Sequence, residues 1–393
     1  MREIILNADV EGAVTFDVAD LANYLERIED PRSEIGRIYP LPMLLIMIIL
    51  AKLAGQDKPW PMVSWVRERK DELKRLFGWE RDQMPCLNTF RTIMEEVVSA
   101  QRLEEVFVSY LHERYGGQES ELIAIDGKTL RGTIPKGMTR GLHLLAVYLP
   151  EEGVTLKQVV VDEKKNEISA SRGLLDDISL KRRIVCADAM HTHRKLSVEI
   201  TARGGNYVWF VKGNQEKLLA DVQRFFEPVR HSAGWHIPAL PVQVAQTSNK
   251  SHGRLEKRIL TLMVDKDDYL DWPALAQLFK LERHVTHIKS GKQTTEVVYG
   301  ITSCKPENVD AQRLLDLIRN YWGIENGLHY RRDVTLREDY TRFSSHTMAT
   351  FMACCNNFIV SLVSKLGFSN LALARRRFDF LISRQLFAAL PLH

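Results

Sequence analysis

The chain has 393 residues, 45% of them hydrophobic and 26% charged, so it can bury a large core in two or three domains. A net charge of +4 permits a nucleic-acid partner without requiring one. The five cysteines form no CxxC pair, a usage typical of buried thiols in a reducing compartment. The longest apolar run, residues 41–51, is too short to span a bilayer, and acidic residues interrupt the first dozen positions. We therefore expect a cytoplasmic protein without a membrane anchor.

Residues 1–115 are predicted to form a helical domain. The run from 39 to 55 is apolar on all sides and ends at a glycine, as a central buried helix would. A charged helix over 65–79 and a helix over 89–116 should follow, separated by a short turn. Two helices joined in this way are compatible with a DNA-reading helix-turn-helix. Plain helical packing is the alternative, because no base-contacting side chain singles the region out.

From residue 116 to 226 the periodicity changes to that of a mixed α/β sheet. A short apolar strand ends at Asp126, and a hairpin is predicted over 141–163. A helix over 166–180 then precedes a second apolar strand, which ends at Asp188. A helix, a strand and a further helix complete this part, so we expect helices to flank the sheet.

Residues 227–303 are predicted to form a β-rich insertion of antiparallel strands. Residues 304–393 should return to the core with a helix over 308–333, capped by Asn308, and then apolar C-terminal helices. A basic run at 375–377 is expected on a solvated helix face.

Three carboxylates in this arrangement indicate a candidate catalytic site. Asp126 and Asp188 each end a buried strand, where open α/β sheets place functional side chains. Glu325 follows the apolar stripe of the helix over 308–333. Converging carboxylates repel one another unless divalent cations lie between them, and oxygen ligands favour Mg²⁺ or Mn²⁺. Each aspartate could instead be a structural cap for the next turn, and Glu325 could belong to an ordinary solvated helix.

Six segments together resemble one known family. They are AIDGKTLRGT (124–133), VVVDEKKNEI (159–168), IVCADAMHT (184–192), KGNQ (212–215), SHGRLEKR (251–258) and RNYWGIENGLHY (319–330) with the acidic residues that follow it. In this order they are similar to the H-repeat-associated bacterial insertion-sequence transposases, which are DDE enzymes with an RNase H-like fold. The resemblance runs from about residue 15 to beyond 345, and it includes a transposase-associated N-terminal domain.

The resemblance implies that Asp126, Asp188 and Glu325 form the catalytic, metal-binding triad of an RNase H-like mixed sheet. It further implies two Mg²⁺ or Mn²⁺ ions as cofactors, and double-stranded DNA as substrate, at terminal inverted repeats and at target sites. It also implies a homodimer in the synaptic complex and a bacterial enzyme associated with the nucleoid. Glu338 and Asp339 lie outside the aromatic helix and rank below Glu325 as the third carboxylate. Four positions depart from the family pattern, and they concern substrate binding more than metal ligation: His193, Tyr321, Tyr330 and Arg332. The wider transposase signature of Tyr, Arg, Glu and Lys around the last carboxylate is only partly met, because Ile318 and Tyr321 occupy its Tyr and Arg places.

Basic and polar residues near these motifs are candidate DNA contacts. They are Lys128, Arg131, His191, Lys212, Asn214, Arg254, Arg258, Arg319, His329 and Arg332. For several of them another role remains open: a charged surface turn for Lys128 and Arg131, an ion-paired strand face for Arg254 and Arg258, and zinc binding or a structural role for His191.

The predicted function is cutting at element ends and joining of 3′ ends by two-metal phosphoryl transfer. One alternative is a nuclease on the same core that cleaves without joining. Another is a DNA-binding regulator derived from a transposase whose triad no longer turns over.

Overall fold

The computed structural model describes residues 4–6, 14–116, 120–161, 170, 173–227, 242–251, 253–265, 269–343 and 345–387. The chain divides into two compact units. The first comprises Met1–Glu119, Gly127–Lys164 and Glu325–His393, and the second comprises Ser120–Asp126 and Lys165–Ile324. The chain thus passes from the second unit to the first directly after Asp126 and again directly before Glu325.

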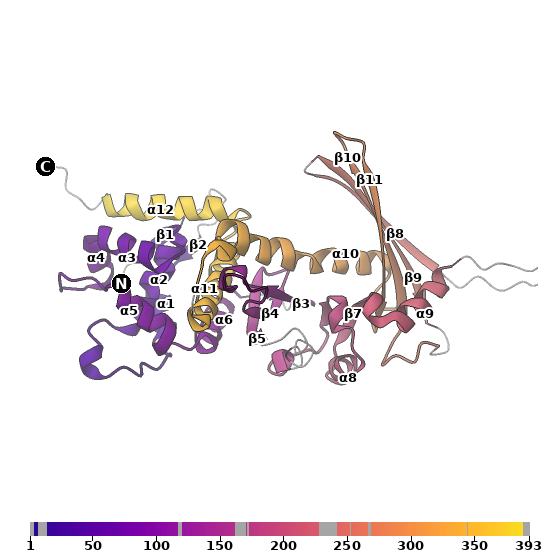
Figure 1. The fold of residues 1–393 in the computed structure, drawn as a ribbon, viewed down its shortest axis with the longest axis horizontal. Coiled ribbons are helices and arrows are strands. Elements are labelled where there is room, and N and C mark those ends of the chain that lie inside the picture. Colours follow the sequence, from indigo (N-terminus) through magenta and orange to yellow (C-terminus); the bar gives the residue numbers. More distant parts are fainter. Residues whose placement is uncertain are drawn as a thin grey trace, which may run out of the picture. The chain divides into compact units, whose positions relative to one another are not determined.

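The first unit is mainly helical, as predicted (Figure 1). Its helices are α1 (Val18–Leu25), α2 (Leu41–Leu53), α3 (Pro59–Glu68), α4 (Lys70–Phe77), α5 (Leu87–Thr92), α6 (Ala100–Tyr115), α11 (His346–Lys365) and α12 (Leu371–Phe387), and its short strands β1 (Ile4–Leu6) and β2 (Val14–Phe16) pair with each other. Helix α2 is buried on nearly all sides because its sequence has no polar face. Helix α11 is buried along almost its whole length and packs on α6.

Two long helices predicted in the N-terminal region are interrupted. The charged helix is divided at Arg69 into α3 and α4. The helix expected over 89–116 contains a π-helical turn at Ile93–Val97, and extended residues then separate it from α6. A DNA-reading role for this region stays a prediction.

Two segments, Glu34–Leu53 and His346–Lys365, are long and apolar enough to cross a membrane by length and composition alone. In the structure 61% of the first segment and 83% of the second are buried. Core helices of soluble proteins meet the same criteria of length and composition.

The predicted hairpin is confirmed in the first unit. Strands β4 (His143–Leu149) and β5 (Val154–Val161) pair antiparallel, with a bulge between Val147 and Tyr148. The strand order in this unit is β5-β4-β3, where β3 (Leu122–Thr129) contributes its last residues.

The second unit contains a mixed sheet, which confirms the predicted fold class at this level. Its strand order is β3-β6-β7-β11-β10-β9-β8, with β6 at Ile184–Ala187, β7 at Asn206–Val211, β8 at Val242–Ser251, β9 at Arg254–Val264, β10 at Gln277–His287 and β11 at Gln293–Thr302. The strands β3, β6 and β7 are parallel, and the others are antiparallel. The β-rich insertion is therefore not a separate sheet, because β11 pairs with β7 and extends the same ladder.

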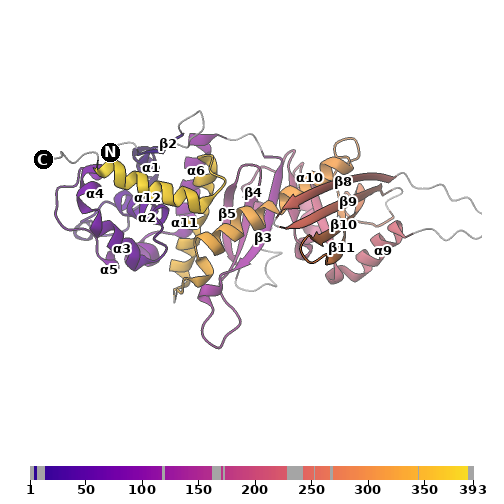
Figure 2. The ribbon, with the colours of Figure 1, turned by 90° about the horizontal axis from the view of Figure 1, so that it is seen from above.

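Helices flank this sheet in the second unit. Helix α10 (Ala311–Tyr321) packs on β8 and β9, whereas α8 (Arg194–Ala202) packs on β7 and α9 (Glu216–Phe226) packs on β11. Figure 2 shows α9 and α10 on opposite sides of the long strands. The helix predicted over 166–180 lies largely outside the described residues.

The helix predicted over 308–333 is shorter than expected. Asp310, not Asn308, caps α10, since its carboxylate accepts a hydrogen bond from the Arg313 N–H at 2.8 Å. After Tyr321 the chain continues as π-helical turns at Ile324–His329 and Arg331–Thr335. Such turns are frequent at functional sites.

Candidate active site

Two aspartates lie at matching positions of neighbouring parallel strands: Asp126 lies within β3, which continues to Thr129, and Asp188 directly follows β6. The register pairs Ile125 of β3 with Ala187 of β6, so Asp126 and Asp188 are the next residues on each strand. Parallel neighbours lie about 4.8 Å apart, and paired residues point to the same face of a sheet. The two carboxylates therefore lie close together near the carboxyl end of β6. Asp188 ends its strand as predicted, whereas β3 continues past Asp126 to Thr129.

The next parallel strand, β7, brings a cation to the same edge. Lys212 directly follows β7, and its Nζ lies 3.1 Å from Oδ1 of Asp188. Both side chains are about half exposed. Asp188 also caps the following turn, because its Oδ1 accepts from the Ala189 N–H at 2.7 Å. The cap and a site role are compatible, since a carboxylate has several acceptor positions.

The remainder of the KGNQ turn serves to fix this edge. The Asn214 amide donates to the Ala189 carbonyl at 2.9 Å, and the Gln215 amide donates to the Thr192 carbonyl at 2.9 Å. A DNA contact at Asn214 stays a prediction, because this internal bond uses only its side-chain amide. The turn therefore ties the end of β7 to the turn that follows Asp188.

His191 was also predicted to contact DNA, and its burial corrects that prediction. The side chain is 1% exposed, so a phosphate cannot reach it without local opening. The sequence signal was misleading because the turn after Asp188 folds inward, which a motif alone does not reveal.

In the first unit, Glu325 lies in the π-helical turn and pairs with His329. The distance from Glu325 Oε2 to His329 Nδ1 is 3.5 Å, and the carboxylate is 69% exposed whereas the imidazole is 6% exposed. The hydrogen bond from His329 lowers the pKa of Glu325, partial burial opposes this effect, and the charges of His329 and Lys128 lower the pKa further. Glu325 is thus an exposed, ionised carboxylate on a buried support.

Gly327 explains why this turn can lie against the hairpin. A Cβ added at Gly327 would lie 2.8 Å from the hydroxyl oxygen of Tyr148 on β4, which is closer than real Cβ contacts allow. Tyr148 is buried, and its burial raises the pKa of the hydroxyl to about 12. A neutral tyrosine therefore supports the turn that carries Glu325.

Lys128 is a buried lysine with two acidic partners in the first unit. Its side chain is 7% exposed, its Nζ contacts Asp333, and Asp339 Oδ1 lies at 3.7 Å. Burial raises the pKa of Asp333, an effect that Lys128 opposes. The adjacent Arg131 is 79% exposed and pairs with Asp339 at 3.7 Å. Arg131 is therefore available to an external anion, whereas Lys128 neutralises internal carboxylates.

Arg332 was predicted to contact DNA, and this prediction is wrong because the side chain is fully buried. Its guanidinium donates to both oxygens of Glu338 at 2.9–3.1 Å, to the Gln158 Oε1 at 2.9 Å and to the Asn357 Oδ1 at 3.0 Å. Although burial alone would raise it, the Arg332 charge holds the pKa of Glu338 below its ordinary value. Glu338 is thus a structural anion, consistent with its rank below Glu325.

The basic run at 375–377 differs from its prediction at Arg375, whereas Arg376 is exposed and Arg377 is half-buried. Arg375 is 7% exposed and not solvated. It donates to the Lys52 carbonyl at 2.8 Å, to Asp57 at 2.8 Å and to the Thr335 carbonyl at 2.9 Å. It thereby connects α12 with α2 and with the segment that follows Glu325.

Of the candidate DNA contacts on β9 and α10, Arg258 and Arg319 are ion-paired. Arg258 pairs with Glu256 at 2.8 Å, and Trp322 lies under the guanidiniums of Arg258 and Arg283 at 5.9 and 5.1 Å. Burial lowers the pKa of Arg258. Arg254 is exposed, and Arg319 pairs with Asp316 at 3.7 Å. This is the ion-paired alternative that the sequence left open, although a DNA contact by exposed Arg254 stays a prediction.

Several candidate functional residues were missed by the sequence reasoning. Arg337 and Tyr340 are exposed and line a hollow of about 760 Å³ with Arg131, Asp333, Val334 and Asp339. The sequence signal that could have found them is the stretch after Asp333, where Arg337 and Tyr340 flank the acidic pair Glu338 and Asp339. Arg283 was missed as well, because its partner Trp322 lies far away in the sequence.

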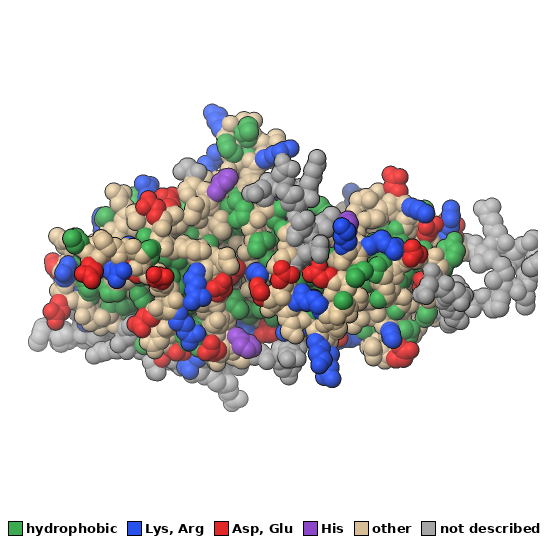
Figure 3. All heavy atoms as spheres, turned by 90° about the horizontal axis from the view of Figure 1, so that it is seen from below, with side chains coloured by type: hydrophobic (Ala, Val, Ile, Leu, Met, Phe, Trp, Pro, Cys, Tyr) green, Lys and Arg blue, Asp and Glu red, His purple; other side chains and the backbone are tan. Residues whose placement is uncertain are grey.

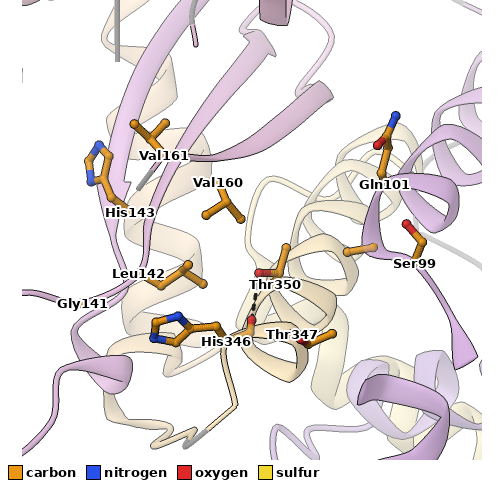
Figure 4. A pocket seen from close by; sticks show the side chains of 11 residues that line it. Ser99, Gln101, Gly141, Leu142, His143, Val160, Val161, His346, Thr347 and Thr350 are labelled. Carbon is orange, nitrogen blue, oxygen red and sulfur yellow. Dashed lines mark hydrogen bonds between the residues drawn. The ribbon is translucent and has the colours of Figure 1, made fainter. Parts of the chain in front are cut away.

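A second hollow in the first unit, of about 500 Å³, lies between β4, β5 and the first turns of α6 and α11 (Figure 4). The side chains of Ser99, His346 and Thr350 line it, and no predicted catalytic carboxylate does. Acidic and basic side chains are interspersed over the face shown in Figure 3, in agreement with the small net charge.

Comparison with known proteins identifies the family. Residues 117–358 match the model of the transposase DDE domain, and residues 22–111 match the region described as DDE_Tnp_1-associated. The chain is 28% identical over 353 residues to "Putative transposase YncI" of Escherichia coli O157:H7, covering 88% of this chain and 87% of that protein. It is 25% identical over 355 residues to "H repeat-associated putative transposase YhhI" of Escherichia coli (strain K12), covering 88% and 91%.

One solved structure is also similar, the "Cryo-EM structure of piggyBac transposase synaptic complex with hairpin DNA (SNHP)". The TM-score is 0.43 at 10% identity, with 96% of this chain and 80% of that chain covered. A similarity at this level carries no argument about the fold or the function of this chain.

Proposed function

Because the chain belongs to the DDE transposase family, we propose that it cuts DNA at the inverted repeats of its own element and joins the freed 3′ ends to target DNA. In this proposal Asp126, Asp188 and Glu325 are the three catalytic carboxylates on an RNase H-like core. Two DNA ends must be processed together, so two copies of the chain act in one complex.

The observation that carries this proposal is the matched position of Asp126 and Asp188. Two like charges at matching positions of neighbouring strands are costly unless a cation neutralises them. Asp188 also caps the turn that follows it, and this role is compatible with a cation shared between the two carboxylates.

The donor set fits divalent cations of the Mg²⁺ class. The three proposed ligands offer only carboxylate oxygens, which Mg²⁺ and Mn²⁺ prefer. The Lys212 ammonium, 3.1 Å from Asp188, shows that this edge attracts positive charge. When bound, a pair of such ions activates the attacking oxygen and stabilises the leaving oxygen.

The other polar residues support these carboxylates. The hydrogen bond from His329 lowers the pKa of Glu325, which favours the ionised form that would hold a cation. Lys212 neutralises Asp188 in the absence of a cation, and its exposed ammonium can then turn to a DNA phosphate. Arg131 offers a second exposed phosphate contact. Removal of either basic residue should weaken DNA binding without abolishing the chemistry.

The test uses labelled DNA that carries the element end, with Mg²⁺ and a target duplex. The wild-type chain should yield joined products, and Asp126→Asn, Asp188→Asn and Glu325→Gln should each remove cutting while DNA binding persists. Asp316→Asn is the matched control, because this carboxylate on α10 is half-buried, accepts from the Gln312 amide at 3.2 Å and lies 3.7 Å from Arg319.

The products separate the alternatives. Cleavage without joining would indicate a nuclease on the same core, and a shifted band without cleavage would indicate a DNA-binding regulator. Cutting retained by any of the three carboxylate variants would show that this residue is not catalytic.

A further inference from the structure

Two loops of the first unit contact each other and form the hollow of about 760 Å³ that Arg131, Arg337 and Tyr340 line. One loop is the short helix Arg131–Thr133, and the other is Glu338–Tyr340. The Arg131 N–H donates to Asp339 Oδ1 at 3.1 Å. A Cβ at Gly132 would overlap the carbonyl oxygen of Thr341, so the backbones touch only because residue 132 is glycine. The hollow is therefore preformed.

Arg337 is held in an unfavourable backbone conformation at the rim of this hollow. Its φ is 50° and its ψ is 37°, a left-handed region that non-glycine residues seldom adopt. The side chain is exposed, so core packing does not require arginine here. Strain of this kind persists at sites where it directs a functional side chain. In this case it directs a guanidinium to the rim.

The charge of the hollow favours an anion in spite of its acidic floor. Lys128, Arg131 and Arg337 supply three positive charges, and Asp333 and Asp339 supply two negative charges. The buried Lys128 contacts Asp333 and lies 3.7 Å from Asp339, so it offsets one of the two negative charges; Arg131 pairs with Asp339 at 3.7 Å, and the five groups together keep one net positive charge. The two exposed guanidiniums remain at the surface, and their planar forks match phosphate oxygens.

Tyr340 adds a flat aromatic surface beside these cations. It is 78% exposed, although tyrosine usually buries most of its ring. No ring partner for Tyr340 occurs among the described residues. Aromatic side chains beside cationic grooves stack on bases of single-stranded nucleic acid, and this stacking does not depend on sequence.

We infer that this hollow holds one unpaired nucleotide of the DNA substrate, with its phosphate between Arg131 and Arg337 and its base on Tyr340. The inference deepens the proposed function and rests on DNA being the substrate. A base within a duplex cannot present its face to the ring, so the occupant is a nucleotide outside the paired helix. The volume of about 760 Å³ is sufficient for one nucleotide and part of the next backbone unit.

The experiment measures binding and photocrosslinking with the full-length chain carrying Glu325→Gln, which separates binding from cutting. The probes are a fluorescent eight-nucleotide oligodeoxythymidylate, the same strand with 5-iododeoxyuridine, and a duplex of equal length. Tyr340→Ala should weaken single-strand binding by about fivefold or more, and Tyr340→Phe should retain it. The crosslink should map to Tyr340, and Arg131→Ala with Arg337→Ala should weaken binding and reduce its salt dependence.

Two matched controls test the specificity of the effect. Tyr269→Ala removes another exposed tyrosine, 63% exposed in the second unit, and Arg342→Ala removes an exposed arginine that does not line the hollow. Neither should change single-strand binding as much as the hollow variants do.

Each outcome decides the inference separately from the proposed function. Crosslinks that map elsewhere, or equal losses for single-strand and duplex probes with Tyr340→Ala, would overturn the nucleotide site. A chain that crosslinks through Tyr340 but never cuts element ends would retain the site and lose the transposase proposal. If Tyr340→Ala leaves both the cutting of element ends and the binding of single strands unchanged, the transposase proposal is retained and the nucleotide site is lost.

Discussion

Replacement of Arg332 by methionine should destabilise the protein severely without acting on DNA directly. The guanidinium is fully buried and bonds Glu338, Gln158 and Asn357. Its removal leaves the Glu338 carboxylate 6% exposed, with the Asn356 amide at 2.8 Å still bonded to it. Breaking one side of a buried ion pair costs about 3–5 kcal/mol. That is a large part of the roughly 5–15 kcal/mol that stabilises a typical domain.

The assay is urea unfolding of Arg332→Met, Glu338→Leu and the double variant. The double variant should recover much of the loss, because two apolar side chains leave no buried charge without its partner. Arg331→Met is the matched control, since Arg331 is half-buried and, among the residues that the structure describes, its side chain bonds only the Ser369 carbonyl at 3.0 Å. It should lose about 1 kcal/mol or less.

A different result would refute this reasoning. If Arg332→Met unfolds at the same urea concentration as the wild type but loses affinity for DNA, the guanidinium must leave its buried position to bind phosphate. The family-based expectation for Arg332 would then be restored.

Two further predictions concern the first unit. Burial raises the pKa of Glu104 to about 8 in the folded protein. The unfolded chain loses this proton at a much lower pH, so the free energy of unfolding should fall as pH rises from about 5 to 8. Glu104→Gln keeps an acceptor for the Gln158 N–H and should reduce that fall by on the order of a few kcal/mol. The free energy of unfolding of both proteins is measured against pH, and the same pH dependence in both would contradict the prediction. Gly327→Ala should cost about 1–3 kcal/mol by overpacking against Tyr148, and the same change in a Tyr148→Phe background should cost clearly less by thermal unfolding.

Local patterns were sufficient to predict the strands that carry the candidate site. The apolar runs before Asp126 and Asp188 became β3 and β6, because a run of buried aliphatic residues has few other conformations open to it. The hairpin of β4 and β5 followed from two apolar segments around a glycine turn. The helical N-terminal region likewise followed from its periodicity.

Other predictions failed where distant segments decide the outcome. His191 and Arg332 were expected at the surface because both are polar and adjoin catalytic motifs, yet both are buried. Arg375 was expected in solvent, yet it bonds Asp57 and the Lys52 carbonyl. A charged residue can be buried once a partner meets it, and a linear pattern contains no information about such partners.

The sequence by itself determined where most strands and helices lie and that Asp126 and Asp188 follow buried aliphatic runs, because those features depend on neighbouring residues. Only the tertiary structure decided that β3 and β6 align Asp126 with Asp188, that the insertion joins the core sheet through β11, and which basic residues remain exposed. The physical reason is that strand register and ion pairing are set by contacts between residues far apart in the chain, whose partners no local pattern specifies.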